Sequence, residues 1–205
     1  MNRIDPDGRD IWEMNAKGEI VWKEESEKHR LYSVDNNGNQ TENYVEIGSR
    51  DVLDQLSANR EDYVGRYSET TNNGTEVLSV FEFASKNSAV EWSYSGYEDN
   101  MYVLSTSHQA GKVQPIEKEF GHKGKTDIFN VHSHPTKDGT QGPSMMDSYN
   151  QQNINPARNS FIYHPYSDTW YKYSSRTIDH RYPNFNGVHQ TISIPRPTLS
   201  VLKNK

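Results

Sequence analysis

The sequence contains no cysteine in its 205 residues. This absence excludes a thiol nucleophile, a cysteine-ligated zinc site and a fold stapled by disulfides. Apolar residues are scarce as well, at 32% of the chain, and no apolar run approaches the length of a transmembrane helix. Basic residues number 22 against 28 acidic ones, and the resulting net charge of −6 argues against a nucleic-acid partner, which requires a basic face.

Aromatic residues compensate for the low apolar content, because 13 Tyr, 6 Phe and 4 Trp supply the bulk of a core. We therefore expect a folded protein with a small core and long polar loops rather than a disordered chain. The length fits one domain, or one domain with an appendage. The N-terminal residues Met1–Pro6 do not form a signal peptide, so we expect no membrane insertion and no cleaved leader on this segment.

The first stretch, residues 1–47, is rich in turn signals. Two short alternating runs, Ile11–Met14 and Glu19–Lys23, flank a turn and predict a β-hairpin. A second hairpin is predicted from Arg30–Val34 and Asn43–Ile47. This part of the chain is therefore predicted to be a segment of β-hairpins that precedes the main domain.

The next stretch, residues 48–180, mixes helical and strand patterns, and residues 181–205 form a tail with three prolines that we expect to drape over the surface. Residues 48–180 are predicted to begin with a helix over Ser49–Ala58 capped by Ser49, a polar loop over Glu61–Gly74 and a helix over Thr75–Asn87. Strands are then predicted over Ala89–Ser95, Met101–Ser107 and Asp127–His134. A helix over Met145–Asn153 and a hairpin from Asn159–His164 and Thr169–Tyr173 complete the predicted elements.

Two histidines on one of these predicted strands are candidate metal ligands. His132 and His134 lie two apart on a predicted strand, so their imidazoles leave from the same face. Ser144 begins a predicted helix, and Asp147 falls in its first turn. Two nitrogens and one carboxylate oxygen suit a zinc ion and leave a fourth position for water. A plain capping arrangement of Ser144 and Asp147, next to an ordinary His-Pro turn, is the alternative interpretation of the same residues.

The order His-x-His-Pro…Ser-x-x-Asp resembles the metal motif of the JAB/MPN (JAMM) metalloprotease family, the zinc isopeptidases related to deubiquitinases. Nine residues, Pro135–Pro143, separate His134 from Ser144, two more than the family usually has. The resemblance spans about residues 75–175. It implies an α+β fold with a layered, cytidine-deaminase-like mixed sheet and flanking helices.

The resemblance also implies the site: one zinc ion per chain on His132, His134 and Asp147. In the family a glutamate after the first helix is the general base, and Glu91 has the matching position, with Glu82 and Glu76 as competitors on the helix itself. We expect the two helical glutamates to be exposed to solvent. Ser144 in the family donates a hydrogen bond to the oxyanion that develops on the scissile carbonyl.

The segment Asp5-Pro6-Asp7-Gly8 resembles the junction that precedes the toxic C-terminal domain of bacterial Rhs-type polymorphic toxins. This resemblance implies a toxin made in the cytoplasm, exported as part of a larger protein, acting on a protein substrate in a target cell and paired with a cognate immunity protein. Two alternatives remain: a non-catalytic MPN-like module that binds proteins and retains the metal site, and a toxin that hydrolyses a bond other than an amide.

The other histidines lack ligand spacing. His164 precedes a proline and is predicted to be a turn or core residue, and the rest are predicted to lie at the surface: His29, His108, His122, His180 and His189. Aromatic residues at strand spacing near the end of the main domain are predicted to be core residues, namely Tyr163, Trp170, Tyr171 and Tyr173.

Overall fold

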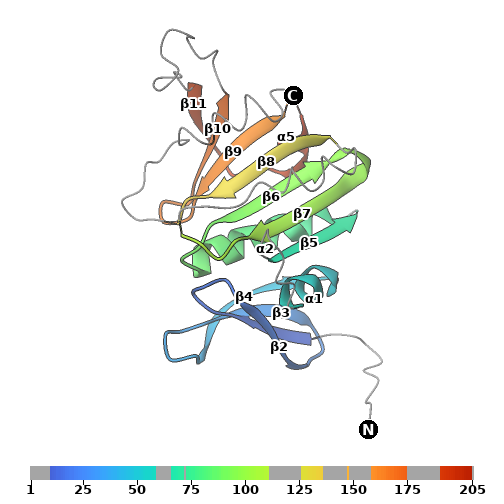
Figure 1. Ribbon diagram of the computed structural model, residues 1–205, viewed down its shortest axis with the longest axis vertical. Coiled ribbons are helices and arrows are strands. Elements are labelled where there is room, and N and C mark those ends of the chain that lie inside the picture. Colours follow the sequence, from blue (N-terminus) through green and yellow to red (C-terminus); the bar gives the residue numbers. More distant parts are fainter. Residues whose placement is uncertain are drawn as a thin grey trace.

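The computed structural model describes residues 10–58, 66–71, 73–110, 126–135, 147, 158–174 and 190–204. The described chain forms two β-sheets with a few helices beside them, and the predicted α+β fold is confirmed (Figure 1). Among these residues, no helix combines the length and the apolar character needed to cross a membrane.

The smaller sheet has the strand order β2-β1-β3-β4, with bounds β1 Asp10–Met14, β2 Ile20–Glu25, β3 His29–Val34 and β4 Gln40–Ile47. The larger sheet has the order β11-β10-β9-β8-β6-β7-β5, with bounds β5 Arg66–Thr71, β6 Trp92–Tyr97, β7 Met101–Thr106, β8 Asp127–Ser133, β9 Asn159–His164, β10 Thr169–Ser174 and β11 Gln190–Ile194. The helices are α1 Asp51–Ser57, α2 Gly74–Asn87, the 3₁₀ turn η1 Glu98–Asn100 and α5 Leu199–Lys203.

Both predicted N-terminal hairpins are confirmed, since β1 pairs with β2 and β3 pairs with β4 in antiparallel fashion. The sequence did not predict that β1 and β3 also pair, in parallel, and so join the two hairpins into one sheet. The first hairpin turns at Gly18, whose φ of +72° favours glycine. A Cβ at Gly18 would lie 2.8 Å from a methyl group of Val90, so this turn packs against the chain just before β6.

Helix α2 covers one face of the larger sheet (Figure 1). The predicted apolar positions Val77, Val80, Phe81 and Ala84 are all fully buried, as helical spacing requires. The ring of Phe81 lies within 6.2 Å of three aromatic rings on the sheet, those of Tyr94, Tyr163 and Trp170. Strand residues that alternate with these rings therefore face the opposite side of the sheet.

The larger sheet is mixed at its centre, where β8 pairs in parallel with β9 and antiparallel with β6. A buried ion pair joins the beginnings of the two parallel strands, with Arg158 Nη1 2.7 Å from Asp127 Oδ2. The hydrogen bonds between parallel strands are evenly spaced, and the register of β8 with β9 runs without a shift from Phe129–Asn159 to Ser133–Tyr163.

Two predictions before α2 are wrong in detail. Helix α1 begins after Arg50, and the Ser49 hydroxyl accepts a hydrogen bond from the Asp51 amide at 3.3 Å instead of capping the helix at its N-cap position. The predicted loop over Glu61–Gly74 contains strand β5, paired with β7 at the edge of the larger sheet. Main-chain hydrogen bonds to β7 hold this edge strand in the sheet, so its sequence does not need to alternate apolar and polar residues.

The predicted draping tail is also wrong, because residues 190–194 add strand β11 to the sheet beside β10. Arg196 then contacts Glu82 on α2 through two hydrogen bonds, at 2.6 and 2.7 Å. Helix α5 follows and buries Leu202 completely. The main chain there is fixed by the Asn159 amide, which donates to the carbonyl oxygens of Leu202 and Asn204.

The two sheets share buried apolar side chains. One continuous cluster includes Trp12 and Leu31 from the smaller sheet, Val52 from α1, and Phe81 and Trp92 around the larger sheet. The division of the chain into residues 1–47, 48–180 and 181–205 stays a prediction, because the buried cluster does not separate the two sheets.

Candidate metal centre

Strand β8 presents the two histidines at its end, on the face of the sheet opposite α2. The predicted strand is confirmed, although it ends at Ser133, one residue before His134. His132 lies opposite Ser93 on β6 and beside Ile162 on β9. The amide of His134 donates to the carbonyl oxygen of Tyr163 at 3.0 Å, so the pairing of β8 with β9 continues through His134.

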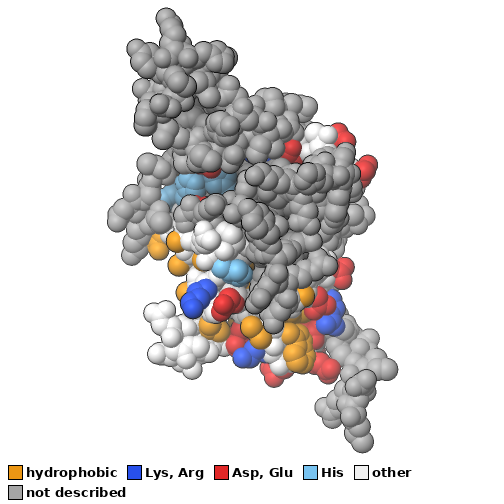
Figure 2. Space-filling view, in the orientation of Figure 1, with side chains coloured by type: hydrophobic (Ala, Val, Ile, Leu, Met, Phe, Trp, Pro, Cys, Tyr) orange, Lys and Arg blue, Asp and Glu red, His pale blue; other side chains and the backbone are white. Residues whose placement is uncertain are grey.

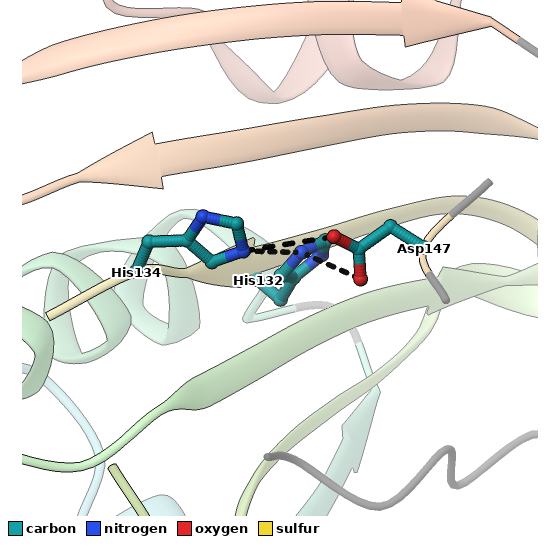
Figure 3. A group of neighbouring side chains, drawn as sticks. All are labelled: His132, His134 and Asp147. Carbon is teal, nitrogen blue, oxygen red and sulfur yellow. Dashed lines mark hydrogen bonds and ion pairs between the residues drawn. The ribbon is translucent and has the colours of Figure 1, made fainter. Parts of the chain in front are cut away.

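Asp147 approaches the two imidazoles from a helical position elsewhere in the chain (Figure 3). The Nε2 atoms of His132 and His134 are 3.1 Å apart. The carboxylate oxygens of Asp147 lie 3.2 Å from Nε2 of His132 and 3.7 Å from Nε2 of His134. All candidate ligand atoms fall within 4.8 Å of one another.

These distances can be compared with those expected around a metal ion. Tetrahedral zinc with ligands at about 2.0–2.1 Å places neighbouring ligand atoms about 3.3 Å apart. The three observed separations lie on either side of this value, and both imidazoles direct the same ring nitrogen, Nε2, toward one point. The donor set therefore fits a single divalent ion, and imidazole with carboxylate suits zinc among other transition metals.

The group lies mostly within the protein. The side chains of His132, His134 and Asp147 are 7%, 13% and 17% exposed, so the three candidate ligands are largely shielded from solvent. The ring of Tyr173 meets that of His132 edge-on at 6.3 Å. In the space-filling view, one patch of histidine surface has a little acidic surface beside it, and a second histidine patch lies lower on the same face (Figure 2).

Glu91 was predicted to lie on the strand after α2, but β6 begins at Trp92 and Glu91 immediately precedes it. Its main chain is nonetheless fixed on both sides, because its amide donates to the Gln109 carbonyl and its carbonyl accepts from the Thr106 hydroxyl. Glu91 is half-buried and lies two residues before Ser93, the residue of β6 that lies opposite His132.

The two competing glutamates have other partners. Glu82 binds Arg196 with both carboxylate oxygens, and Glu76 accepts a hydrogen bond from the Gly48 amide at 2.9 Å. Both side chains are partly buried, so the expectation that they are simply exposed to solvent is wrong. Their positions on α2 were predicted correctly.

Ser144 lies outside the described residues, as does the predicted helix over Met145–Asn153 except for Asp147, which is helical. His122, His180 and His189 lie outside them as well. His164 is buried, as predicted. His29 is also buried, contrary to the prediction, because its Nδ1 accepts a hydrogen bond from the Asp10 amide at 3.2 Å. His108 is half-buried and hydrogen-bonds the carbonyl oxygen of Lys17.

Sequence reasoning missed a polar group beside the histidines. The amide nitrogen of Asn130 donates to the hydroxyl oxygens of Ser93 and Ser95, at 2.9 and 2.8 Å, and all three side chains are buried. Asn130 lies two residues before His132, so this group ties β6 to β8 on the face that carries the candidate metal ligands. Only the register between β6 and β8, which are separated by β7 in sequence, reveals it.

A mixed sheet that brings two imidazoles and a carboxylate together defines a candidate metal-binding domain. Residues 69–158 match the family model described as JAB-like toxin 1. This stretch of the chain is similar to a JAB-like toxin domain, and it includes Glu91, both histidines and Asp147. No curated protein and no solved structure matches the chain significantly.

Proposed function

We propose that the chain is a zinc-dependent peptidase or isopeptidase that acts as the toxic C-terminal domain of a bacterial Rhs-type polymorphic effector. The observation that carries the proposal is the convergence of His132, His134 and Asp147 within a JAB-like toxin domain. Histidine and carboxylate are the ligands of hydrolytic zinc sites, which keep one position open for chemistry.

A bound zinc ion would polarise the scissile carbonyl and lower the pKa of a water molecule. Glu91 takes the proton from the attacking water and delivers it to the leaving amine, a role that suits a half-buried carboxylate next to the strand that pairs with β8. Ser144, three residues before Asp147, donates a hydrogen bond to the developing oxyanion. The fixed main chain of Glu91 supports this role, because a base must be held in place near the reacting atoms.

The biological setting follows from two resemblances. The matched family is a toxin family, and Asp5-Pro6-Asp7-Gly8 resembles the Rhs junction. The proposed substrate is accordingly a protein in a target cell, and a cognate immunity protein would protect the producing cell. Export as part of a larger toxin is part of the same proposal.

Removal of the metal tests the reaction. We expect the purified chain, incubated with a lysate of bacterial target cells, to generate new protein N-termini or to release conjugated proteins. Treatment with a zinc chelator should abolish these products, and added zinc should restore them. Terminal-amine labelling with mass spectrometry measures both kinds of cleavage.

Two outcomes would contradict the proposal. Cleavage that persists unchanged in a metal-free sample would exclude the metal-dependent reaction. If the chain binds zinc and lysate proteins but cleaves no amide bond, the non-catalytic binding module, or a toxin with another target bond, describes it better.

A further inference from the structure

A third imidazole, that of His164, lies beside the candidate metal centre. The parallel register matches His132 to Ile162, and the hydrogen bond from the His134 amide to the Tyr163 carbonyl extends this pairing by two residues. His134 and His164 are therefore neighbours on adjacent strands, about 4.8 Å apart along the direction of the sheet hydrogen bonds. Both side chains leave from the same face, opposite α2.

The two ring nitrogens of His164 differ in their partners. Nδ1 lies 3.1 Å from the hydroxyl oxygen of Ser167, in the turn between β9 and β10. Nε2 is buried and has no hydrogen-bond partner within the described chain. An imidazole nitrogen buried without a partner is costly, so its retention at this position calls for a ligand or a partner.

His164 is a buried side chain. Burial lowers the pKa of His164 from its ordinary value, and the electrostatic interaction with His134 acts in the same direction. The residue is 2% exposed. A neutral ring has one nitrogen that donates and one that accepts.

We propose that His164 is a positioning residue of the metal centre, whose Nε2 accepts a hydrogen bond from Nδ1 of His134 when a metal ion fixes the His134 ring. Figure 3 shows the ring of His134 with Nε2 toward Asp147 and its other nitrogen turned toward the neighbouring strand, β9. A histidine that binds metal through one nitrogen ordinarily donates the other N–H to an acceptor, which sets its tautomer and orientation.

The tautomers along this chain of hydrogen bonds agree with one another. His134 binds the metal through Nε2 and carries its proton on Nδ1. His164 accepts that bond at Nε2 and carries its own proton on Nδ1, which donates to the Ser167 hydroxyl oxygen. The proposal deepens the proposed metal site and depends on it, although it does not depend on peptidase activity.

Zinc affinity of the purified full chain, measured by competition with a chromophoric chelator, tests this role without any substrate. We expect His164→Leu to weaken zinc binding by about 10–100-fold, the usual loss when a partner of a ligating histidine is removed. A matched pair of variants locates the effect on one nitrogen: His164→Gln keeps an acceptor near the position of Nε2, whereas His164→Asn keeps one near Nδ1. The glutamine variant should retain more affinity than the asparagine variant.

His29→Leu is the control, because His29 is a buried histidine of the smaller sheet and its loss should lower stability without changing zinc affinity. Unchanged affinity in a folded His164→Leu variant would overturn the positioning role and leave the metal site standing. Equal losses in the glutamine and asparagine variants would assign the effect to packing and overturn it too. A wild-type chain that binds no zinc would overturn the metal site itself, and this role with it.

Discussion

Glu91→Gln should reduce hydrolysis by about 10²–10⁴-fold, the usual contribution of a positioned general base. The amide of glutamine has nearly the shape of the carboxylate but cannot take a proton from water. The candidate metal ligands are unchanged in this variant, so its zinc content should match that of the wild type. Initial rates of cleavage at equal protein and zinc concentrations measure the effect.

Glu82→Gln is the matched control. It makes the same chemical change on α2, where the carboxylate binds Arg196, so its cleavage rate should remain close to that of the wild type. If Glu91→Gln cleaves or poisons cells as well as the wild type does, Glu91 is not the base. A selective loss in Glu82→Gln would transfer that role to α2.

Arg158→Met should lower the free energy of unfolding by about 3–5 kcal/mol, as expected when one partner of a buried ion pair is removed. Arg158 and Asp127 are separated by 2.7 Å, and their side chains are only 3% and 6% exposed. Methionine roughly keeps the length of the side chain but removes the cation that lies against the buried carboxylate of Asp127. Urea unfolding followed by tryptophan fluorescence measures the change.

The double variant Asp127→Leu/Arg158→Met is the control for this effect. Since it removes both charges, it should be more stable than Arg158→Met alone. A loss below about 1 kcal/mol in Arg158→Met, a value typical of exposed pairs, would show that this ion pair does little to hold β8 and β9 together.

The parts of the site that are close in sequence could be predicted from the sequence. Two residues of spacing on one strand place His132 and His134 on the same face, and this follows from strand geometry alone. Helix α2 could also be predicted from local spacing, because its apolar residues recur with helical periodicity. The approach of Asp147 came instead from the resemblance to a known motif.

Features that depend on distant pairing could not be predicted. Strand β11 joins the sheet by pairing with β10, whereas the three prolines of residues 181–205 suggested a loose tail. The position of His164 beside His134 and the hydrogen bond of Asn130 to Ser93 both depend on the register of neighbouring strands. A one-residue change of register would place these side chains on opposite faces, and local sequence does not determine it.

Metal content per chain tests the central claim most directly. The protein is purified without a metal-affinity tag, and its zinc is measured beside that of His134→Ala by inductively coupled plasma mass spectrometry. We predict close to one zinc ion per wild-type chain and its loss in the variant, because His134 supplies one of three ligands that converge on one point. Absence of metal from both proteins, even after incubation with zinc, would contradict the account and favour a protein-binding module.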